Sequence, residues 1–345
     1  GVLTRGNFWI VIIAACIILM LCGLWRKDGA MLLLMLLIVV MPICMKNGIE
    51  LIYEQMPIDR YPDAIYPEIT DRGVSYWKDL MAKYGTVPVC MDSFIDSMIY
   101  KGRISYVQEQ VQMMEQDLAL ASRLGFSCIR VLALMAPEVL EQALPAAEYY
   151  GIAMGLEVHP PHALNGKWML NVAELARKHG TDKIGLIPDF GIFMTGLNGA
   201  QLHAARVTGE KEAVLAYVTE AVKNKENFGK IIARAREMGA GSRIMGALNN
   251  AAMMNRYSEP ALLKDIIDVT LHIHGKFNQM DENCEETAIN YREPIEMLKK
   301  LNWDGYICSE FEGQRAYHGQ DCPYEEDEIE QVRRHHEMLK RYIGE

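Results

Sequence analysis

Short apolar runs alternate with longer segments of helical period along most of the chain. Seven runs predict β-strands, at 48–54, 86–94, 126–134, 152–160, 184–193, 270–277 and 303–311. Helical periodicity lies between them, as over 106–124 and 168–179, and Gly85, Gly125 and Gly180 stand where helices end. Strands and helices in regular alternation are typical of an α/β fold with a parallel sheet. A charged helix over 325–342 closes the pattern, and its His335 and His336 are expected at the surface.

The first 47 residues are apolar to an unusual degree. Residues 8–25 form an almost unbroken apolar run, and a second run over 30–45 contains Pro42. The second run falls short of the roughly 20 residues that span a bilayer, and no small-residue cleavage site indicates a signal peptide. A membrane segment is therefore disfavoured. We expect the first strand of a barrel within 8–22 and its helix within 30–45, although a barrel helix is normally amphipathic.

The predicted architecture is one (β/α)8 TIM barrel covering 1–345, with 1–47 as an atypical apolar first strand and helix. After the sixth predicted strand, residues 194–268 are far too many for an ordinary βα loop. The part at 211–237 is charged and has helical period, and 238–254 is rich in Gly, Ala and Met. This long helical insertion is a candidate lid or partner surface, with a passive insertion as the alternative.

Composition narrows the classes of partner and compartment. A formal net charge of −10 and an isoelectric point near 5.5 argue against a nucleic-acid partner, because phosphate backbones require a basic surface. Eight cysteines form no CxxC pair, and Cys90, Cys128 and Cys308 lie within apolar runs. Such positions are typical of buried thiols in a reducing compartment, so a cytoplasmic location is expected.

Acidic and imidazole side chains close several of the apolar runs. Glu157, Asp189 and Glu310 stand near predicted strand ends, and the strand before the last carries both His272 and His274. The carboxyl ends of barrel strands meet at one mouth, so these groups are expected to converge there. Three carboxylates and an imidazole suit a hard divalent cation, with Mn²⁺ as first choice and Mg²⁺ or another divalent ion as alternatives. Taken singly, each acid could equally cap a helix or form an ion pair.

His159 is the candidate acid-base residue. It lies two residues after Glu157, and side chains at i and i+2 of a strand share a face. A neutral imidazole at that position is suited to proton transfer near neutral pH. The alternatives are a fifth metal ligand or a residue that hydrogen-bonds a carboxylate ligand.

The chain resembles a known family from about residue 48 to its C-terminus. The segments that carry the resemblance are KYGTVPVCMDSF, GLEVHPP with its E-x-H, PDFGIF, HIHGKFNQMD, SEFEG and EEDEIEQVRRHHEMLKR. Together they resemble the sugar phosphate isomerase/epimerase group of xylose-isomerase-like TIM barrels, and within it the α (catalytic) subunits of bacterial C-glycoside deglycosidases. E-x-H alone is a weak signal, whereas the ordered set is fairly specific. Residues 1–47 depart from the family, whose first strand and helix are less apolar.

The resemblance implies both a site and an activity. The metal would be bound by Glu157, Asp189, His274 and Glu310, with His159 as the catalytic base. The activity would be a metal-dependent β-elimination that cleaves the C-glycosidic bond of 3-oxo-C-glycosides of aromatic aglycones such as flavonoids. The substrate is then a small-molecule oxidised sugar glycoside, and a smaller β subunit is the expected partner in a hetero-oligomer.

Other functions would use the same residues differently. A keto-sugar epimerase or isomerase would reprotonate the enediolate, with Glu157 and Glu310 as its acid-base pair. A metal-dependent endonuclease is disfavoured by the acidic charge, and a membrane-anchored sugar-binding module is suggested only by residues 1–47.

Five further charged residues are candidate sugar contacts. Glu54, Asp92 and Arg130 lie at other predicted strand ends, and Lys276 and Arg315 lie near the last two. Each could instead form a structural ion pair.

Overall fold

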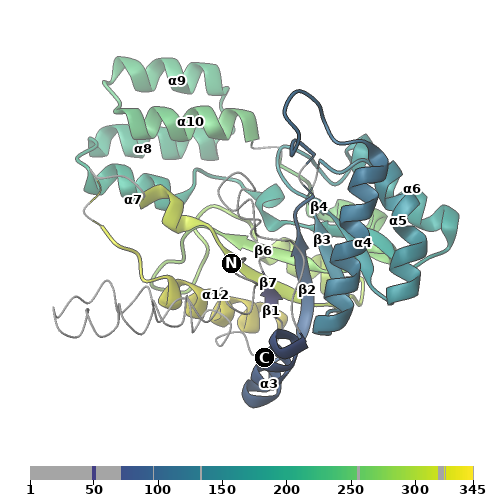
Figure 1. The fold of residues 1–345 in the computed structure, drawn as a ribbon. Coiled ribbons are helices and arrows are strands. Elements are labelled where there is room, and N and C mark those ends of the chain that lie inside the picture. The colour runs from purple at the N-terminus through teal and green to yellow at the C-terminus, as the bar shows by residue number, and fades with distance from the viewer. Residues whose placement is uncertain are drawn as a thin grey trace. The chain divides into compact units, whose positions relative to one another are not determined.

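The computed structural model describes residues 49–51, 71–95, 97–132, 134–254, 257–317, 322 and 324–344 (Figure 1). The strand and helix expected within 1–47, and the candidate sugar contact Glu54, lie outside these residues. The chain divides into two compact units, one of 1–156 with 175–185 and one of 157–174 with 186–345. The expectation of one domain over 1–345 stays a prediction.

Four parallel strands pair in chain order in the first unit. They are β1 (Ile49–Leu51), β2 (Pro88–Ser93), β3 (Cys128–Val131) and β4 (Ala153–Val158), the last of which ends in the second unit. Every residue of β4 is buried, as expected for strands of a parallel sheet covered on both faces. The register places Cys90 beside Cys128 and Asp92 beside Arg130. Cys90, Cys128 and Cys308 are buried, as predicted.

The second unit also holds parallel strands. β5 (Ile184–Pro188) starts in the first unit, and the Asp189 amide after it donates to the Val158 carbonyl oxygen at 3.2 Å. Parallel bridges join Leu186 to Thr270 and Asp189 to His274. The second bridge reaches β6 (Ile273–Phe277), which pairs in parallel with β7 (Ile307–Phe311). Parallel strands in chain order with helices between them confirm, for the described residues, the predicted fold class of a (β/α)8 barrel.

Helices separate the strands where the sequence predicts them. They are α3 (Asp71–Tyr84), α4 (Val107–Leu124), α5 (Pro137–Tyr150) and α6 (Lys167–His179). Gly85, Gly125 and Gly180 directly follow three of them with φ angles of 64°, 89° and 60°. Residues with side chains rarely adopt these left-handed angles, so glycine stops each helix and turns the chain toward the next strand.

Four helices occupy the predicted insertion. They are α7 (Gly199–Val207), α8 (Glu212–Lys223), α9 (Phe228–Glu237) and α10 (Ser242–Met254), followed by 3₁₀ segments η2 (Pro260–Asp265) and η3 (Ile267–Val269). The apolar faces of α8, α9 and α10 pack into a separate cluster, in which Val218, Ile231 and Leu248 are fully buried. Figure 1 shows these three helices side by side. The insertion therefore has its own small core, while its role as a lid or partner surface stays a prediction.

The C-terminal helix corrects one expectation from the sequence. α12 (Glu328–Ile343) contacts α11 (Arg292–Lys300) and β7, and its His335 is fully buried. The His335 ring stacks on Phe277 with 4.2 Å between ring centroids, and its Nδ1 atom lies 2.7 Å from the Ser309 hydroxyl. The surface placement of His335 is therefore wrong, because this residue belongs to the helix face that packs on the strands. Burial lowers the pKa of His335 well below its usual value, so its ring stays neutral.

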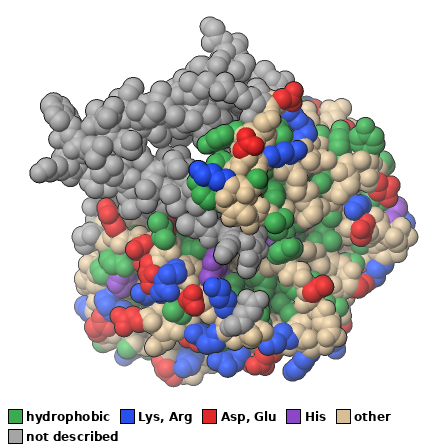
Figure 2. All heavy atoms as spheres, turned by 90° about the horizontal axis from the view of Figure 1, so that it is seen from below, with side chains coloured by type: hydrophobic (Ala, Val, Ile, Leu, Met, Phe, Trp, Pro, Cys, Tyr) green, Lys and Arg blue, Asp and Glu red, His purple; other side chains and the backbone are tan. Residues whose placement is uncertain are grey.

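The surface carries charged side chains of both signs. On the face drawn in Figure 2, lysine and arginine side chains lie among acidic ones, with hydrophobic side chains between them. Within the described part of the chain, no helix combines the length and the apolar character needed to cross a membrane.

Candidate metal centre

Four side chains from four successive strands, or from the residue directly after a strand, converge in the second unit. Glu157 lies in β4, Asp189 follows β5, His274 lies in β6 and Glu310 lies in β7. One potential ligand atom from each lies within 4.8 Å of those of the other three. Glu157, Asp189 and His274 are buried, and the Glu310 side chain is 10% exposed. The structure thus brings together the four residues predicted as metal ligands.

The imidazole of His274 is flanked by two carboxylates. Its Nδ1 atom lies 3.1 Å from Glu310 Oε2 and 3.4 Å from Glu157 Oε1. The neighbouring imidazole, His272, falls instead into a second cluster with His274 and Cys308. The geometry therefore favours His274 over its rival His272 as the partner of the carboxylates.

Lys276 joins the same cluster. Its Nζ atom lies 2.9 Å from Asp189 Oδ2, 3.5 Å from Glu310 Oε2 and 3.4 Å from Glu312 Oε2. Burial by itself would lower the pKa of Lys276, but Asp189, Glu310 and Glu312 together raise it well above its usual value. The ammonium is therefore charged at neutral pH, two residues beyond His274 on the same face of β6.

The formal charges of the cluster fit a divalent cation. Glu157, Asp189 and Glu310 carry three negative charges when ionised. Lys276 compensates one of them, and the nearby Glu312 is compensated by Arg315. Burial raises the pKa of Asp189, and the positive charge of Lys276 opposes that shift. Two negative charges remain in a space that is almost closed to water, and uncompensated buried charge is costly. One divalent ion would neutralise them.

The donor set and its spacing also fit such an ion. Ligand atoms that share a small divalent cation at about 2.1 Å lie no more than about 4.2 Å apart. The potential ligand atoms lie within 4.8 Å of one another here, so a small inward rotation of the side chains would bring them to these distances. Three carboxylates with one imidazole are typical of Mn²⁺ or Mg²⁺ rather than of a structural zinc site, which is richer in sulfur and nitrogen.

Asp189 is held by a local turn that the sequence pattern did not reveal. The stretch expected to continue the strand instead forms a 3₁₀ turn, η1 (Phe190–Phe193), because Asp189 Oδ1 accepts a hydrogen bond of 2.6 Å from the Gly191 amide. A Cβ atom on Gly191 would lie 2.8 Å from Asp189 Oδ1 and 3.4 Å from Lys276 Cδ. A side chain at this position would therefore displace the Asp189 carboxylate, and glycine avoids that contact. The feature of the sequence that could have indicated this turn is the glycine two residues after Asp189.

His159 lies just beyond β4 and is partly buried. Its Nδ1 atom is 2.6 Å from the Pro160 carbonyl oxygen, which can only accept a hydrogen bond. In the neutral ring this contact places the proton on Nδ1 and leaves the lone pair on Nε2. When protonated, His159 would lower the pKa of Asp189, so the ring is within electrostatic reach of the cluster.

The remaining candidate sugar contacts have different surroundings. Arg130 Nε lies 3.0 Å from Asp92 Oδ1 in the first unit, and both side chains are nearly buried. Arg315 is largely exposed and pairs with Glu312 at 2.9 Å. These contacts are ion pairs, and roles in sugar binding stay predictions.

Comparison of the sequence with curated proteins finds similar deglycosidase subunits. A C-glycoside deglycosidase alpha subunit from Arthrobacter globiformis is 29% identical over 76% of the chain and 74% of its own length. A 3'-dehydrocarminate deglycosidase alpha subunit from a Microbacterium species is 28% identical over 81% of the chain and 82% of its own length. The chain is a homologue of these alpha subunits. The resemblance found in the sequence is thereby confirmed, and the chain is an enzyme.

Two further comparisons complete this picture. No protein-family model matches the chain. Among solved structures, a D-tagatose 3-epimerase-like protein aligns with 87% of the chain and 97% of its own length, with 16% identity and a TM-score of 0.42.

Proposed function

We propose that this homologue of deglycosidase alpha subunits cleaves the C-glycosidic bond of oxidised sugar glycosides with the help of a divalent metal ion. Glu157, Asp189, His274 and Glu310 would hold the ion, most readily Mn²⁺. The observation that carries the proposal is the convergence of their ligand atoms within 4.8 Å. Similarity to proteins named as deglycosidases supports the reaction class.

Oxidation of the sugar explains how a carbon–carbon bond could break. A C-glycosidic bond resists acid-catalysed hydrolysis because its carbon leaving group has no lone pair to protonate. A keto group at C3 makes the proton on C2 acidic. Loss of that proton lets a C1–C2 double bond form while the bond from C1 to the aglycone breaks. The electron pair of the broken bond goes to the aglycone carbon, which takes up a proton. When bound, a divalent ion supplies a Lewis acid that stabilises negative charge developing on the sugar oxygens.

We assign to His159 the role of the base that removes the proton from C2. The Pro160 carbonyl holds the neutral ring with its proton on Nδ1, so Nε2 is the atom that can accept a proton. The imidazolium formed in this way can return the proton to the departing aglycone carbon. Lys276, which contacts Asp189 and Glu310, is assigned as a hydrogen-bond donor to a sugar oxygen.

A smaller β subunit is part of the proposal, since both relatives are named as alpha subunits. The helical insertion is the candidate surface for it or for a lid. Its last helix, α10, presents Met253 with 65% of its surface exposed, and methionine adapts readily to irregular apolar contacts.

The test is an assay of metal-free protein supplied with Mn²⁺, Mg²⁺ or neither, with and without a candidate β subunit. A 3-oxo-C-glucoside and a free keto-hexose are the substrates, and released aglycone and epimerised sugar are measured separately. Metal-dependent release of aglycone is expected. Epimerisation without release of aglycone would support the alternative function, an epimerase or isomerase with Glu157 and Glu310 as its acid-base pair.

His159→Ala tests the assigned base. We expect aglycone release and exchange of the C2 hydrogen with deuterated water to fall by about 100-fold or more, the usual range for a general base, while Mn²⁺ affinity stays unchanged. His162→Ala is the matched control, because His162 lies in the same loop and its amide donates to the His159 carbonyl. Full exchange activity in His159→Ala would remove His159 from the mechanism.

A further inference from the structure

A second cluster of metal-ligating side chains lies beside the carboxylates. It consists of His272, His274 and Cys308, and one potential ligand atom from each lies within 4.8 Å of the other two. All three side chains are buried, with exposed fractions of 1%, 0% and 3%. This cluster takes no part in the chemistry proposed above, apart from the shared His274.

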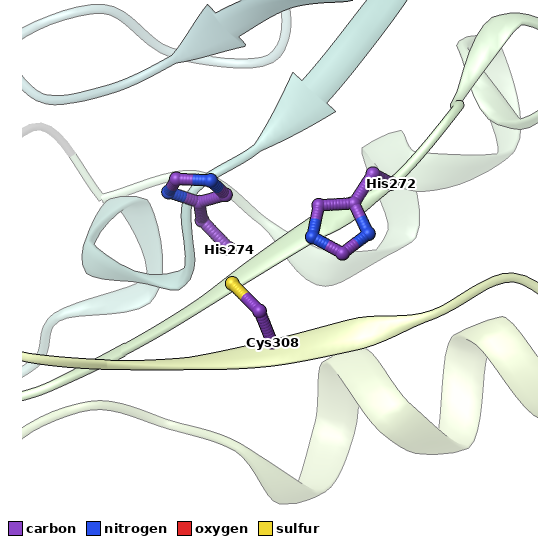
Figure 3. Close-up of side chains that lie close together, drawn as sticks. All are labelled: His272, His274 and Cys308. Atoms are coloured by element: carbon purple, nitrogen blue, oxygen red, sulfur yellow. The ribbon is translucent and has the colours of Figure 1, made fainter. Parts of the chain in front are cut away.

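The two strands explain why these side chains meet. His272 and His274 are separated by two positions and project to the same side of the chain. Cys308 of β7 stands opposite His274 in the parallel register. The two rings are nearly perpendicular, with 5.9 Å between their centroids, and the sulfur of Cys308 points toward them (Figure 3). Gly275 follows His274 in β6, and a Cβ atom there would lie 2.2 Å from the Cys308 carbonyl oxygen, so a side chain does not fit at this position.

We propose that His272, His274 and Cys308 form a second metal site, which takes a thiophilic divalent ion of the zinc class. A thiolate with two imidazoles is a donor set typical of Zn²⁺ or Co²⁺, and three protein ligands leave a fourth position of a tetrahedron open. The carboxylate cluster differs in kind, because its oxygen donors favour harder ions. Binding deprotonates the Cys308 thiol and releases that proton to solvent.

The shared imidazole couples the two sites. The Nδ1 atom of His274 faces Glu157 and Glu310, and the two nitrogens of an imidazole point in divergent directions, so Nε2 is the atom for the second site. A neutral imidazole carries one proton and can offer a lone pair from only one nitrogen. Filling both sites would therefore require His274 to lose its last proton. An ion at the thiolate site consequently weakens binding at the carboxylate cluster.

Cobalt spectroscopy tests the site without relying on catalysis. Metal-free protein is titrated with Co²⁺, and the near-ultraviolet charge-transfer band of a cobalt–thiolate bond is recorded together with the release of protons. We expect the band in the wild-type chain, its loss in Cys308→Ser and its retention in Glu310→Gln. Prior addition of Mn²⁺ is expected to raise the Co²⁺ concentration needed for the band.

Cys128→Ser provides the matched control. Cys128 is another buried thiol on a strand, and it lies beside Cys90 in the register. The proposal requires Cys128→Ser to keep the band. Loss of the band in that variant and its retention in Cys308→Ser would assign the metal to the Cys90 and Cys128 pair and overturn the proposal, as would absence of the band in the wild-type chain.

A second variant keeps the test informative if Cys308→Ser does not fold. His272→Gln leaves the thiol in place, so the band should survive while the Co²⁺ dissociation constant rises at least tenfold. An unchanged dissociation constant would overturn the assignment of His272. The carboxylate site, read by Mn²⁺ affinity in the same variant, serves as the internal check because His272 does not belong to it.

Discussion

Lys276 shows how a single charge can decide the stability of the metal-free site. Its ammonium lies within 3.5 Å of three carboxylate side chains, those of Asp189, Glu310 and Glu312. Only 7% of the Lys276 side chain is exposed, so these contacts are poorly screened by water. In this setting the lysine is a structural counter-ion as well as a candidate sugar contact.

Lys276→Met removes the charge and keeps most of the side-chain volume. We expect the metal-free protein to lose about 3 kcal/mol of unfolding free energy, because breaking a buried ion pair leaves charge uncompensated. Saturating Mn²⁺ should restore part of the loss. Denaturant unfolding with and without Mn²⁺ measures both effects. Lys340→Met, at an exposed pair 3.9 Å from Glu337, should change stability by less than about 1 kcal/mol; equal losses in the two variants would contradict the role of Lys276.

The sequence predicted which candidate side chains converge better than it predicted their local conformations. Glu157, Asp189 and Glu310 were identifiable because each ends or interrupts a buried apolar run, where an acid needs a special reason. The choice of His274 over His272 could not follow from periodicity, since both lie on one face. The structure places His274 Nδ1 beside Glu310 and Glu157, and the strand register bridges Asp189 to His274. The pairing of Cys308 with these histidines was hidden for the same reason.

Elements were predictable where the pattern of burial is regular. All described strands lie within the predicted apolar runs. β4, β5 and β6 are buried at every residue, as expected of parallel strands covered on both faces. The error at Phe190–Phe193 arose because an apolar sequence is equally compatible with a buried 3₁₀ turn, which the Asp189 carboxylate selects. The error at His335 arose because a charged helix still needs one face against the strands.

The insertion helices should behave as a separate element. Leu248 is fully buried among α8, α9 and α10, so Leu248→Ala is expected to cost 2–5 kcal/mol, the usual range for such a cavity. Amide hydrogen exchange should accelerate over 199–254 while Mn²⁺ affinity is unchanged. Met253→Ala, at an exposed position of α10, should leave exchange unaltered. A parallel loss of Mn²⁺ affinity in Leu248→Ala would show that the insertion supports the metal ligands.

Glu286 anchors the segment that connects β6 to α11. Its side chain is partly buried and accepts hydrogen bonds from the amides of Ile289, Ala288 and Asn278. Burial raises the pKa of Glu286 to about 7, from an ordinary value of 4.5, although these amide hydrogen bonds oppose the shift. The folded chain therefore holds a proton that the unfolded chain has already lost between these two pH values.

This shift predicts a pH dependence with a definite sign. Because the folded-state pKa is the higher one, the unfolding free energy should fall as pH rises from about 4.5 to about 7, by about 3 kcal/mol from this group. Glu286→Gln removes the titration, so its stability difference between pH 4.5 and pH 7.5 should be smaller than that of the wild-type chain by that amount. Glu282→Gln, at an exposed neighbouring position, serves as the control and should keep the wild-type slope. An unaltered slope in Glu286→Gln would locate the pH dependence elsewhere.

At the scale of the whole molecule, the metal centre should connect chain segments that are far apart in sequence. The four candidate ligands span Glu157 to Glu310, and all four belong to the second unit. An ion that binds only the folded arrangement stabilises it by mass action, about 2.7 kcal/mol at 100 times the dissociation constant. The net charge of −10 adds long-range attraction for any cation, so the specific effect needs a charge-matched comparison.

Glu310→Gln and Glu312→Gln provide that comparison, since each removes one negative charge from the same stretch of chain. Glu310 is one of the four converging residues, whereas Glu312 is outside that set and contacts Lys276 and Arg315. We expect Mn²⁺ to raise the melting temperature of the wild-type chain and of Glu312→Gln, and to have little effect on Glu310→Gln. Isothermal titration calorimetry should show the matching loss of Mn²⁺ affinity. Equal stabilisation of both variants would mean that Mn²⁺ acts through the overall charge of the chain and not through the four converging ligands.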